Sequence, residues 1–177
     1  MNVNGGDHTA DSNITKRALA ASCKKLMEHT PIEKISVFDI CEACEMNRKS
    51  FYYHFRDKYD LVNWISDFEF FRTPEIANVN SPLDYIERLC VYLYANRSFY
   101  NRAFKIKGTN SFCEHFRVKL SPVVAELISD NGDDMSDFRL DFYLDAYCGA
   151  FERWMRTKDC DDDVSFFQKL KNCFPLT

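Results

Sequence analysis

Residues 36–61, with the sequence SVFDICEACEMNRKSFYYHFRDKYDL, constrain the fold of this chain more than any other segment. Their pattern predicts two short helices joined by a tight turn, followed by the start of another helix. The second of these helices begins with Arg48 and Lys49 and continues with hydroxyl, aromatic and imidazole side chains. A short helix with cations at its exposed N-terminus suits the major groove of DNA, with phosphate contacts on both sides.

The segment NRKSFYYHFRDKYDL resembles the recognition helix and the next helix start of the TetR/AcrR-type transcriptional regulators. Their usual pattern is a small polar residue, a variable pair, Thr or Ser, Leu or Phe, Tyr, a variable residue, His, Phe, and then Lys after a short polar link. The corresponding residues here are Asn47, Arg48, Lys49, Ser50, Phe51, Tyr52, Tyr53, His54, Phe55 and Lys58. The match covers residues 14–65, and NRKSFYYHF…KYDLVNW also resembles the branch that contains the activator of dihydroxyacetone-kinase operons, which works with a ligand-sensing partner.

The resemblance implies a set of DNA-binding side chains. Arg48, Lys49 and Tyr53 would face base edges, where cations donate well to the O6 and N7 acceptors of guanine. Hydroxyl and imidazole groups on the same helix would hold phosphates, as would residues at the starts of the neighbouring helices. The expected DNA-binding residues are Ser36, Asn47 (as the helix cap), Arg48, Lys49, Ser50, Tyr52, Tyr53, His54 and Lys58. The alternative for Tyr52 and His54 is a place in the core, which Phe51 and Phe55 already supply at i and i+4.

The rest of the chain favours helices, because it has only 5 Gly and 5 Pro and few β-branched runs. The apolar spacing predicts an all-α fold of about nine helices. The resemblance implies that these form an N-terminal three-helix helix-turn-helix DNA-binding module and a C-terminal helical regulatory and dimerisation bundle. Residues 1–13 are expected to be a disordered N-terminus, residues 14–71 the DNA-binding domain and residues 72–177 the regulatory and dimerisation domain, with a linker near residues 72–82.

Several boundaries follow from capping residues. The first helix is expected from Ile14 to His29, capped by Ser12 or Asn13. Ser36 and Asp39 form a capping-box pattern at the second helix, whose core contacts would come from Ile35, Phe38 and Ile40.

The last two helices, expected at residues 136–157 and 164–173, carry apolar stripes. Those stripes are Leu140, Tyr143, Leu144, Tyr147, Phe151 and Trp154, and then Phe166, Phe167, Leu170 and Phe174. Aromatic residues at helical spacing are usually core, but the resemblance implies that these two helices pair with their symmetry mates as a four-helix bundle. Two recognition helices would then meet the half-sites of a near-palindromic operator.

The turn between the two DNA-binding helices departs from the family pattern. A glycine is usual there, because the backbone takes a positive φ, but this chain has Glu45. A residue with a Cβ in the left-handed conformation costs on the order of 1–2 kcal/mol. Glu45 therefore predicts either a strained turn or a turn of different shape, and it brings a negative charge close to the expected DNA surface.

A net charge of −4 argues against nucleic acid if the chain is taken as a whole. Local charge matters more, because an electric field decays over roughly 10 Å at moderate salt. The basic stretches are Lys16, Arg17, Lys24 and Lys25 in the first helix, and Arg48, Lys49, Arg56 and Lys58 around the recognition helix. The alternative reading of these charges is an ordinary solvated surface.

Other function classes find little support. Cys41 and Cys44 are spaced as C-x-x-C, but no second pair follows, so they are expected to pack as small buried residues and not to bind metal. Ser50 and His54 have no acid to orient the imidazole, so neither catalysis nor a cofactor is expected. No apolar stretch approaches 18 residues and residues 1–13 do not resemble a secretory signal, so we expect a cytoplasmic protein without membrane contact.

Three hypotheses remain open. The leading one is a homodimeric DNA-binding transcriptional regulator controlled by a small effector, for which no ligand residues are named. The second keeps the DNA-binding module but assigns control to a ligand-sensing partner protein. The third is a helical interaction protein without DNA binding, motivated by Glu45 and the acidic total.

Overall fold

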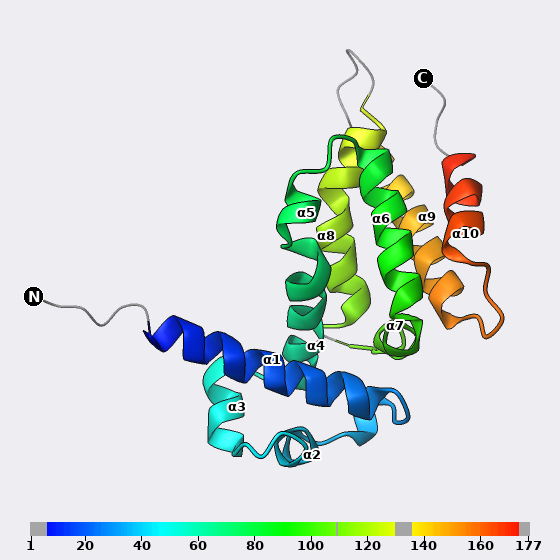
Figure 1. Cartoon of the computed structure of the whole chain (residues 1–177). Helices are drawn as coiled ribbons and strands as arrows, with labels where there is room; N and C mark the ends of the chain where they lie inside the picture. Colours follow the sequence, from blue (N-terminus) through cyan, green and yellow to red (C-terminus); the bar gives the residue numbers. More distant parts are fainter. Residues whose placement is uncertain (1–6, 109, 130–135, 174–177) are drawn as a thin grey trace, which may run out of the picture. The chain divides into compact units, whose positions relative to one another are not determined.

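The computed structural model describes residues 7–108, 110–129 and 136–173 (Figure 1). Within these residues the chain consists of helices and the loops that join them, and it contains no strand. The all-α prediction is confirmed. The chain divides into two compact units, Met1–Ile65 and Ser66–Thr177, and each is described by itself.

The first unit contains four α-helices and one short 3-10 helix. These are α1 (Asp7–Met27), η1 (Ile32–Lys34), α2 (Val37–Glu42), α3 (Arg48–His54) and α4 (Lys58–Ser66), the last of which ends one residue beyond the unit. Helix α1 begins seven residues before Ile14, so Ser12 and Asn13 lie inside it and do not cap it. No Gly or Pro interrupts residues 7–13, which allows the helix to extend back through the stretch expected to be disordered. Residues 1–6 lie outside the described residues.

The core of the first unit forms where α1 packs against α2 and α3. Its fully buried side chains are Leu19, Cys23, Met27, Ile32, Ile40, Phe51, Leu61, Val62 and Ile65. Phe51 and Phe55 point inward as expected, with ring centroids 5.7 Å apart. The expected core role of Phe38 is wrong, because 56% of this residue is exposed. Phe38 precedes Ile40 by two positions, which places it on the opposite side of α2 from that buried residue.

The second unit contains six α-helices and one turn of π-helix. These are η2 (Asp67–Phe71), α5 (Pro74–Ala77), α6 (Pro82–Ala95), α7 (Arg97–Ala103), α8 (Phe112–Leu127), α9 (Asp137–Arg156) and α10 (Asp163–Lys171). Helix α5 lies in the segment expected to be a linker, so the described residues form ten α-helices, where about nine were expected. Ser81, Ser111, Ser136 and Asp162 cap α6, α8, α9 and α10, each accepting a backbone N–H three residues later.

Aromatic rings fill the interior of the second unit. Tyr100, Phe112, Phe116 and Phe151 are completely buried. The ring centroids of Tyr100 and Phe112 lie 5.3 Å apart, and those of Phe116 and Phe151 lie 5.4 Å apart. Contacts of this kind add to the stabilisation from buried area. The aromatic content of the chain therefore serves mainly as core in this unit.

The two apolar stripes of the last helices are both largely buried. Helix α10 packs against α6, its Phe166 also stacks on Trp154 of α9, and its residues Phe166, Phe167 and Leu170 are buried. These three side chains therefore belong to the core, whereas the pairing of the last two helices with a second copy stays a prediction; Phe174 lies outside the described residues. Helix α9 packs against α8, yet it leaves Phe138 and Phe142 exposed.

A buried ionic cluster joins η2 to α8 inside the second unit. The carboxylate of Asp67 lies 2.7 Å from Arg72 Nη2, 2.9 Å from His115 Nε2 and 3.0 Å from Lys119 Nζ. Burial raises the pKa of Asp67, but the bonds from His115 and Lys119 outweigh burial and hold that pKa below its usual value. A buried carboxylate needs such partners, because an unpaired buried charge is strongly destabilising.

Candidate DNA-binding surface

Helix α3 is held at its N-terminus by Asn47. The side-chain carbonyl of Asn47 accepts the backbone N–H of Ser50 at 2.9 Å, and the Ser50 hydroxyl lies 3.3 Å from the same oxygen. The predicted cap is confirmed. Two of the expected DNA-binding side chains, Asn47 and Ser50, are therefore bonded to each other, and they fix where the helix begins.

The first turn of α3 exposes its two cations, Arg48 and Lys49. This turn contains no acidic residue, although a helix N-terminus favours negative charge by typically about 0.3–1 kcal/mol. Two cations at this end oppose the helix dipole and contribute nothing to the core. Their placement suits an anionic partner in front of the helix better than it suits the stability of the helix itself.

The aromatic side chains of α3 lie on its outer surface. Tyr53 is 83% exposed and Tyr52 is 51% exposed, so neither belongs to the core. The guanidinium carbon of Arg48 lies 6.0 Å from the centroid of the Tyr52 ring, which orders both side chains on one side of the helix. The outward orientation inferred for Tyr52 therefore agrees with the structure.

His54, at the end of α3, is half-buried. Its ring lies edge-on to Tyr53, with centroids 4.9 Å apart. Burial and the nearby charge of Lys16 both lower the pKa of His54 below its usual value of 6.5. The imidazole is therefore neutral at pH 7, and it has one N–H to donate.

Ser36 and Asp39 complete the capping box that the sequence predicts for α2. The Ser36 hydroxyl accepts the backbone N–H of Asp39 at 3.1 Å and donates to its carboxylate at 2.8 Å, while the Ser36 backbone N–H donates to that carboxylate at 2.7 Å. These bonds lower the pKa of Asp39. The Ser36 hydroxyl is thus already engaged within the protein, although the residue is exposed.

Lys58 performs a structural task that sequence reasoning missed. Its ammonium donates to the carbonyl oxygens of Ile35 at 2.7 Å and Glu33 at 3.1 Å. These bonds tie the first turn of α4 to the segment between η1 and α2. An ammonium has three N–H groups, so one remains for a phosphate oxygen. Sequence reasoning missed this contact because Lys58 and Ile35 lie 23 residues apart in the chain.

The turn between α2 and α3 has the geometry usual for glycine, although Glu45 occupies it. Glu45 has a φ of 55°, and the N–H of Met46 closes the turn on the carbonyl of Cys41 at 2.9 Å. Of the two possibilities raised by the sequence, the structure has the strained turn. Cys41 is buried, and the half-buried Cys44 donates its thiol to the carbonyl of Ile40 at 3.3 Å, so both cysteines pack locally.

Lys16 is a further cation near α3 that was not assigned a site. Its ammonium lies 6.0 Å from the ring of Trp64, and its charge acts on His54. The basic stretch of the first helix was the sequence signal for it. Among the expected DNA-binding residues, Arg48, Lys49, Tyr52 and Tyr53 are thus exposed on α3 and His54 is half-buried at its end. Ser36, Asn47, Ser50 and Lys58 are engaged in caps or in internal hydrogen bonds.

Among residues 7–108, 110–129 and 136–173, no group of three or more His, Cys, Asp or Glu side chains could hold a metal ion. No helix of the same ranges has the length and apolar character needed to cross a membrane.

Family models match both units. Residues 16–65 match the family described as bacterial regulatory proteins, tetR family, and residues 80–174 match a transcriptional regulator C-terminal region. The chain is 30% identical over 133 residues to the HTH-type dhaKLM operon transcriptional activator DhaS of Lactococcus lactis subsp. lactis (strain IL1403), covering 72% of this chain and 67% of that protein.

Solved structures show the same fold. The dihydroxyacetone kinase operon activator DhaS matches with a TM-score of 0.65 and 24% identity, over 90% of this chain and 93% of that chain. A TetR transcriptional regulator from Streptococcus agalactiae 2603V matches with a TM-score of 0.71 and 18% identity, over 97% of this chain and 100% of that chain. The first unit carries the helix-turn-helix of DNA-binding regulators, and members of this family are transcription factors, not enzymes. The chain therefore belongs to the tetR family of bacterial transcription regulators and is related to its DhaS branch.

Proposed function

We propose that the protein is a homodimeric regulator that binds a near-palindromic operator and is controlled by a small effector. The observation that carries the proposal is the outer surface of α3, where Arg48, Lys49 and Tyr53 project from a helix that Asn47 caps. In this proposal those three side chains read base edges, each good bidentate pair contributing about 1–3 kcal/mol of discrimination.

The remaining side chains would position α3 on the DNA backbone. Ser50, Tyr52 and His54 would contact phosphates of one strand, Tyr52 through its exposed hydroxyl and His54 through its one imidazole N–H. Lys58 would use its third N–H for another phosphate. Ser36 would have to exchange its bond with Asp39 for such a contact, because its hydroxyl is engaged in the capping box.

Dimerisation would use the outer face of α8 and α9. Val118 on α8 and Phe138 and Phe142 on α9 are 69%, 79% and 61% exposed, an unusual amount for large apolar side chains. Arg117 of α8 bonds to Asp141 at 2.6 Å and also to Asp145, which holds the two helices together at that level. Pairing of α8 and α9 with their symmetry mates would form a four-helix bundle and would place two copies of α3 on two half-sites.

Control by a partner protein is the second candidate. The relative DhaS is named as an operon activator, and the buried rings leave the middle of the second unit well filled. A signal would then reach the protein at its surface. In either case residues 14–71 would form the DNA-binding domain and residues 72–177 the regulatory and dimerisation domain, acting in the cytoplasm where the chromosome lies.

The test is selection of bound duplexes from a random DNA pool by the purified protein. The wild type should enrich an inverted repeat, and the variant Arg48→Ala/Lys49→Ala should enrich no sequence. A control variant, Lys107→Ala/Lys171→Ala, removes the same charge from exposed positions of the second unit and should enrich the wild-type repeat. Enrichment of the repeat by the Arg48→Ala/Lys49→Ala variant, or of none by the wild type, would contradict the proposal.

A further inference from the structure

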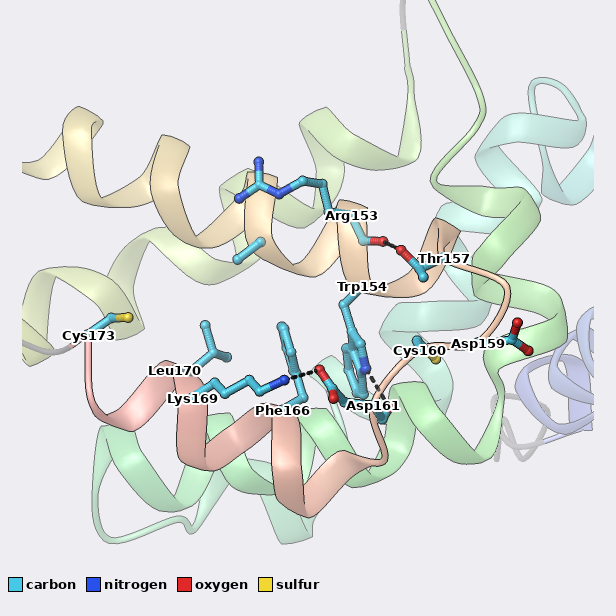
Figure 2. A pocket seen from close by; sticks show the side chains of 11 residues that line it. Arg153, Trp154, Thr157, Asp159, Cys160, Asp161, Phe166, Lys169, Leu170 and Cys173 are labelled. Carbon is cyan, nitrogen blue, oxygen red and sulfur yellow. Dashed lines mark hydrogen bonds and ion pairs between the residues drawn. The ribbon is translucent and has the colours of Figure 1, made fainter.

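A groove of about 370 Å³ runs between α9 and α10 in the second unit (Figure 2). One wall is a face of α9 that includes Ala150 and Trp154, and the other is a face of α10 that includes Phe166 and Leu170. The loop at residues 157–161 closes one end. The volume falls within the range of small-molecule sites, about 300–1,000 Å³.

The floor of the groove is a rigid aromatic surface. The indole N–H of Trp154 donates to the backbone carbonyl of Asp161 at 2.8 Å, which fixes the ring in its plane. The Trp154 ring stacks on Phe166 with centroids 4.0 Å apart and planes 9° apart, and it is nearly parallel to Tyr94 at 6.1 Å. Trp154 is only 4% exposed, so a ligand in the groove would meet an edge of this stack, and that edge needs no rearrangement.

One cation of the groove has no partner among the described residues. Lys169 is committed to the carboxylate of Asp161 at 2.7 Å. The guanidinium of Arg153 is exposed and makes no hydrogen bond or ion pair with any side chain in the described parts of the chain. Figure 2 shows Asp159 on the far side of Trp154 from this guanidinium, so the acidic end and the basic end of the groove are separate.

We propose that this groove binds a small organic carboxylate with a flat apolar body, of the class that benzoate represents. The ring would lie over Ala150, against the accessible edges of Trp154 and Leu170, and the carboxylate would accept two parallel N–H bonds from Arg153. Ala150 supplies the space for the ring, because a larger side chain at that position would fill the groove. The use of the groove to control DNA binding rests on the proposed function, whereas ligand binding does not.

The experiment uses the full chain with Trp64→Phe, which leaves Trp154 as the remaining tryptophan of two. Benzoate should change the fluorescence of Trp154 in a saturable way, and calorimetry should give the same dissociation constant. The neutral analogue benzamide should bind at least about tenfold more weakly, because it cannot form charge-assisted bonds with the guanidinium.

Two variants test the site itself. Arg153→Leu should weaken benzoate at least about tenfold while leaving benzamide nearly unchanged. Ala150→Leu should abolish the binding of both compounds while retaining the cation. The control Arg156→Leu lies on the same helix outside the groove, where its guanidinium binds Glu152 at 2.6 Å, and it should leave both affinities unchanged.

The outcomes separate the two proposals. The ligand-site proposal would be overturned if the fluorescence change with benzoate did not saturate. It would also be overturned if neither Arg153→Leu nor Ala150→Leu changed the affinity for benzoate. The same preparations are assayed for the selected inverted repeat. If the protein binds the inverted repeat but not benzoate, only the ligand-site proposal is rejected. If the protein binds benzoate but selects no repeat, the ligand site is supported and the proposed function is rejected.

Discussion

The strained turn at Glu45 permits a quantitative test. A residue with a Cβ at a φ of 55° costs about 1–2 kcal/mol relative to the right-handed region. Glycine avoids this strain, but its extra freedom in the unfolded chain costs about 0.5–1 kcal/mol. The difference predicts that Glu45→Gly raises the free energy of unfolding by about 0.5–1 kcal/mol. The Glu45 side chain is exposed and bonds to no other described residue, so its loss removes no contact.

The measurement is urea denaturation followed by the fluorescence of Trp64, which lies in the first unit, in a Trp154→Phe background. Glu45→Ala is the matched control, because it removes the same carboxylate but keeps the Cβ and the strain. It should therefore show no gain in stability. A Glu45→Gly protein no more stable than Glu45→Ala would refute the strain argument. Both variants remove a negative charge beside α3, so both should bind the selected operator more tightly at low salt, and by a similar factor.

Three further predictions concern dimerisation and internal ion contacts. Phe142→Asp should convert a dimer to a monomer in sedimentation velocity with the helical circular dichroism retained; a dimer that persists would exclude this face of α9. Lys58→Met should lower the free energy of unfolding by about 1.5–3 kcal/mol in urea, because two carbonyls lose a charged donor, whereas the exposed Lys34→Met should change little. Asp67→Asn should destabilise by about 3–5 kcal/mol, and Asp84→Asn, an exposed control, by much less. The pKa of Asp67 is lowered on folding, so the ionised carboxylate stabilises the protein above the usual carboxyl pKa of 3.8, and this stabilisation is lost as pH falls through the lower pKa of the folded state. The difference in unfolding free energy between wild type and Asp67→Asn should therefore shrink in acid. A difference that stays constant would contradict this assignment.

Sequence reasoning succeeded where the relevant physics is local. Asn47 and Ser36 lie within three residues of the N–H groups that they cap, so their patterns predicted the starts of α3 and α2. The positive φ at Glu45 was one of two possibilities, which arose because the family resemblance places a glycine at this turn. Phe51 and Phe55 were assigned to the core because i and i+4 lie on one face of a helix.

Sequence reasoning failed where a residue's environment comes from distant parts of the chain. Lys58 was assigned to a phosphate, which stays a prediction, but its bonds to two carbonyls more than twenty residues away were missed. Phe38 was assigned to the core from its apolar character, although no element of the first unit covers it. Helix α1 also begins earlier than its capping signal, because a cap residue favours a helix end but does not prevent the helix from continuing.

The amino-acid sequence by itself determined the all-α class, the helix-turn-helix segment and the outward cations of α3, because each depends on spacing within one or two turns. Tertiary structure alone decided which apolar side chains of the last helices remain exposed. The stripes of α9 and α10 are both largely buried, among other contacts by the stacking of Trp154 on Phe166, whereas Phe138 and Phe142, on the opposite side of α9, stay exposed. Spacing specifies which side of a helix is apolar, whereas burial depends on which surface of another element packs against that side.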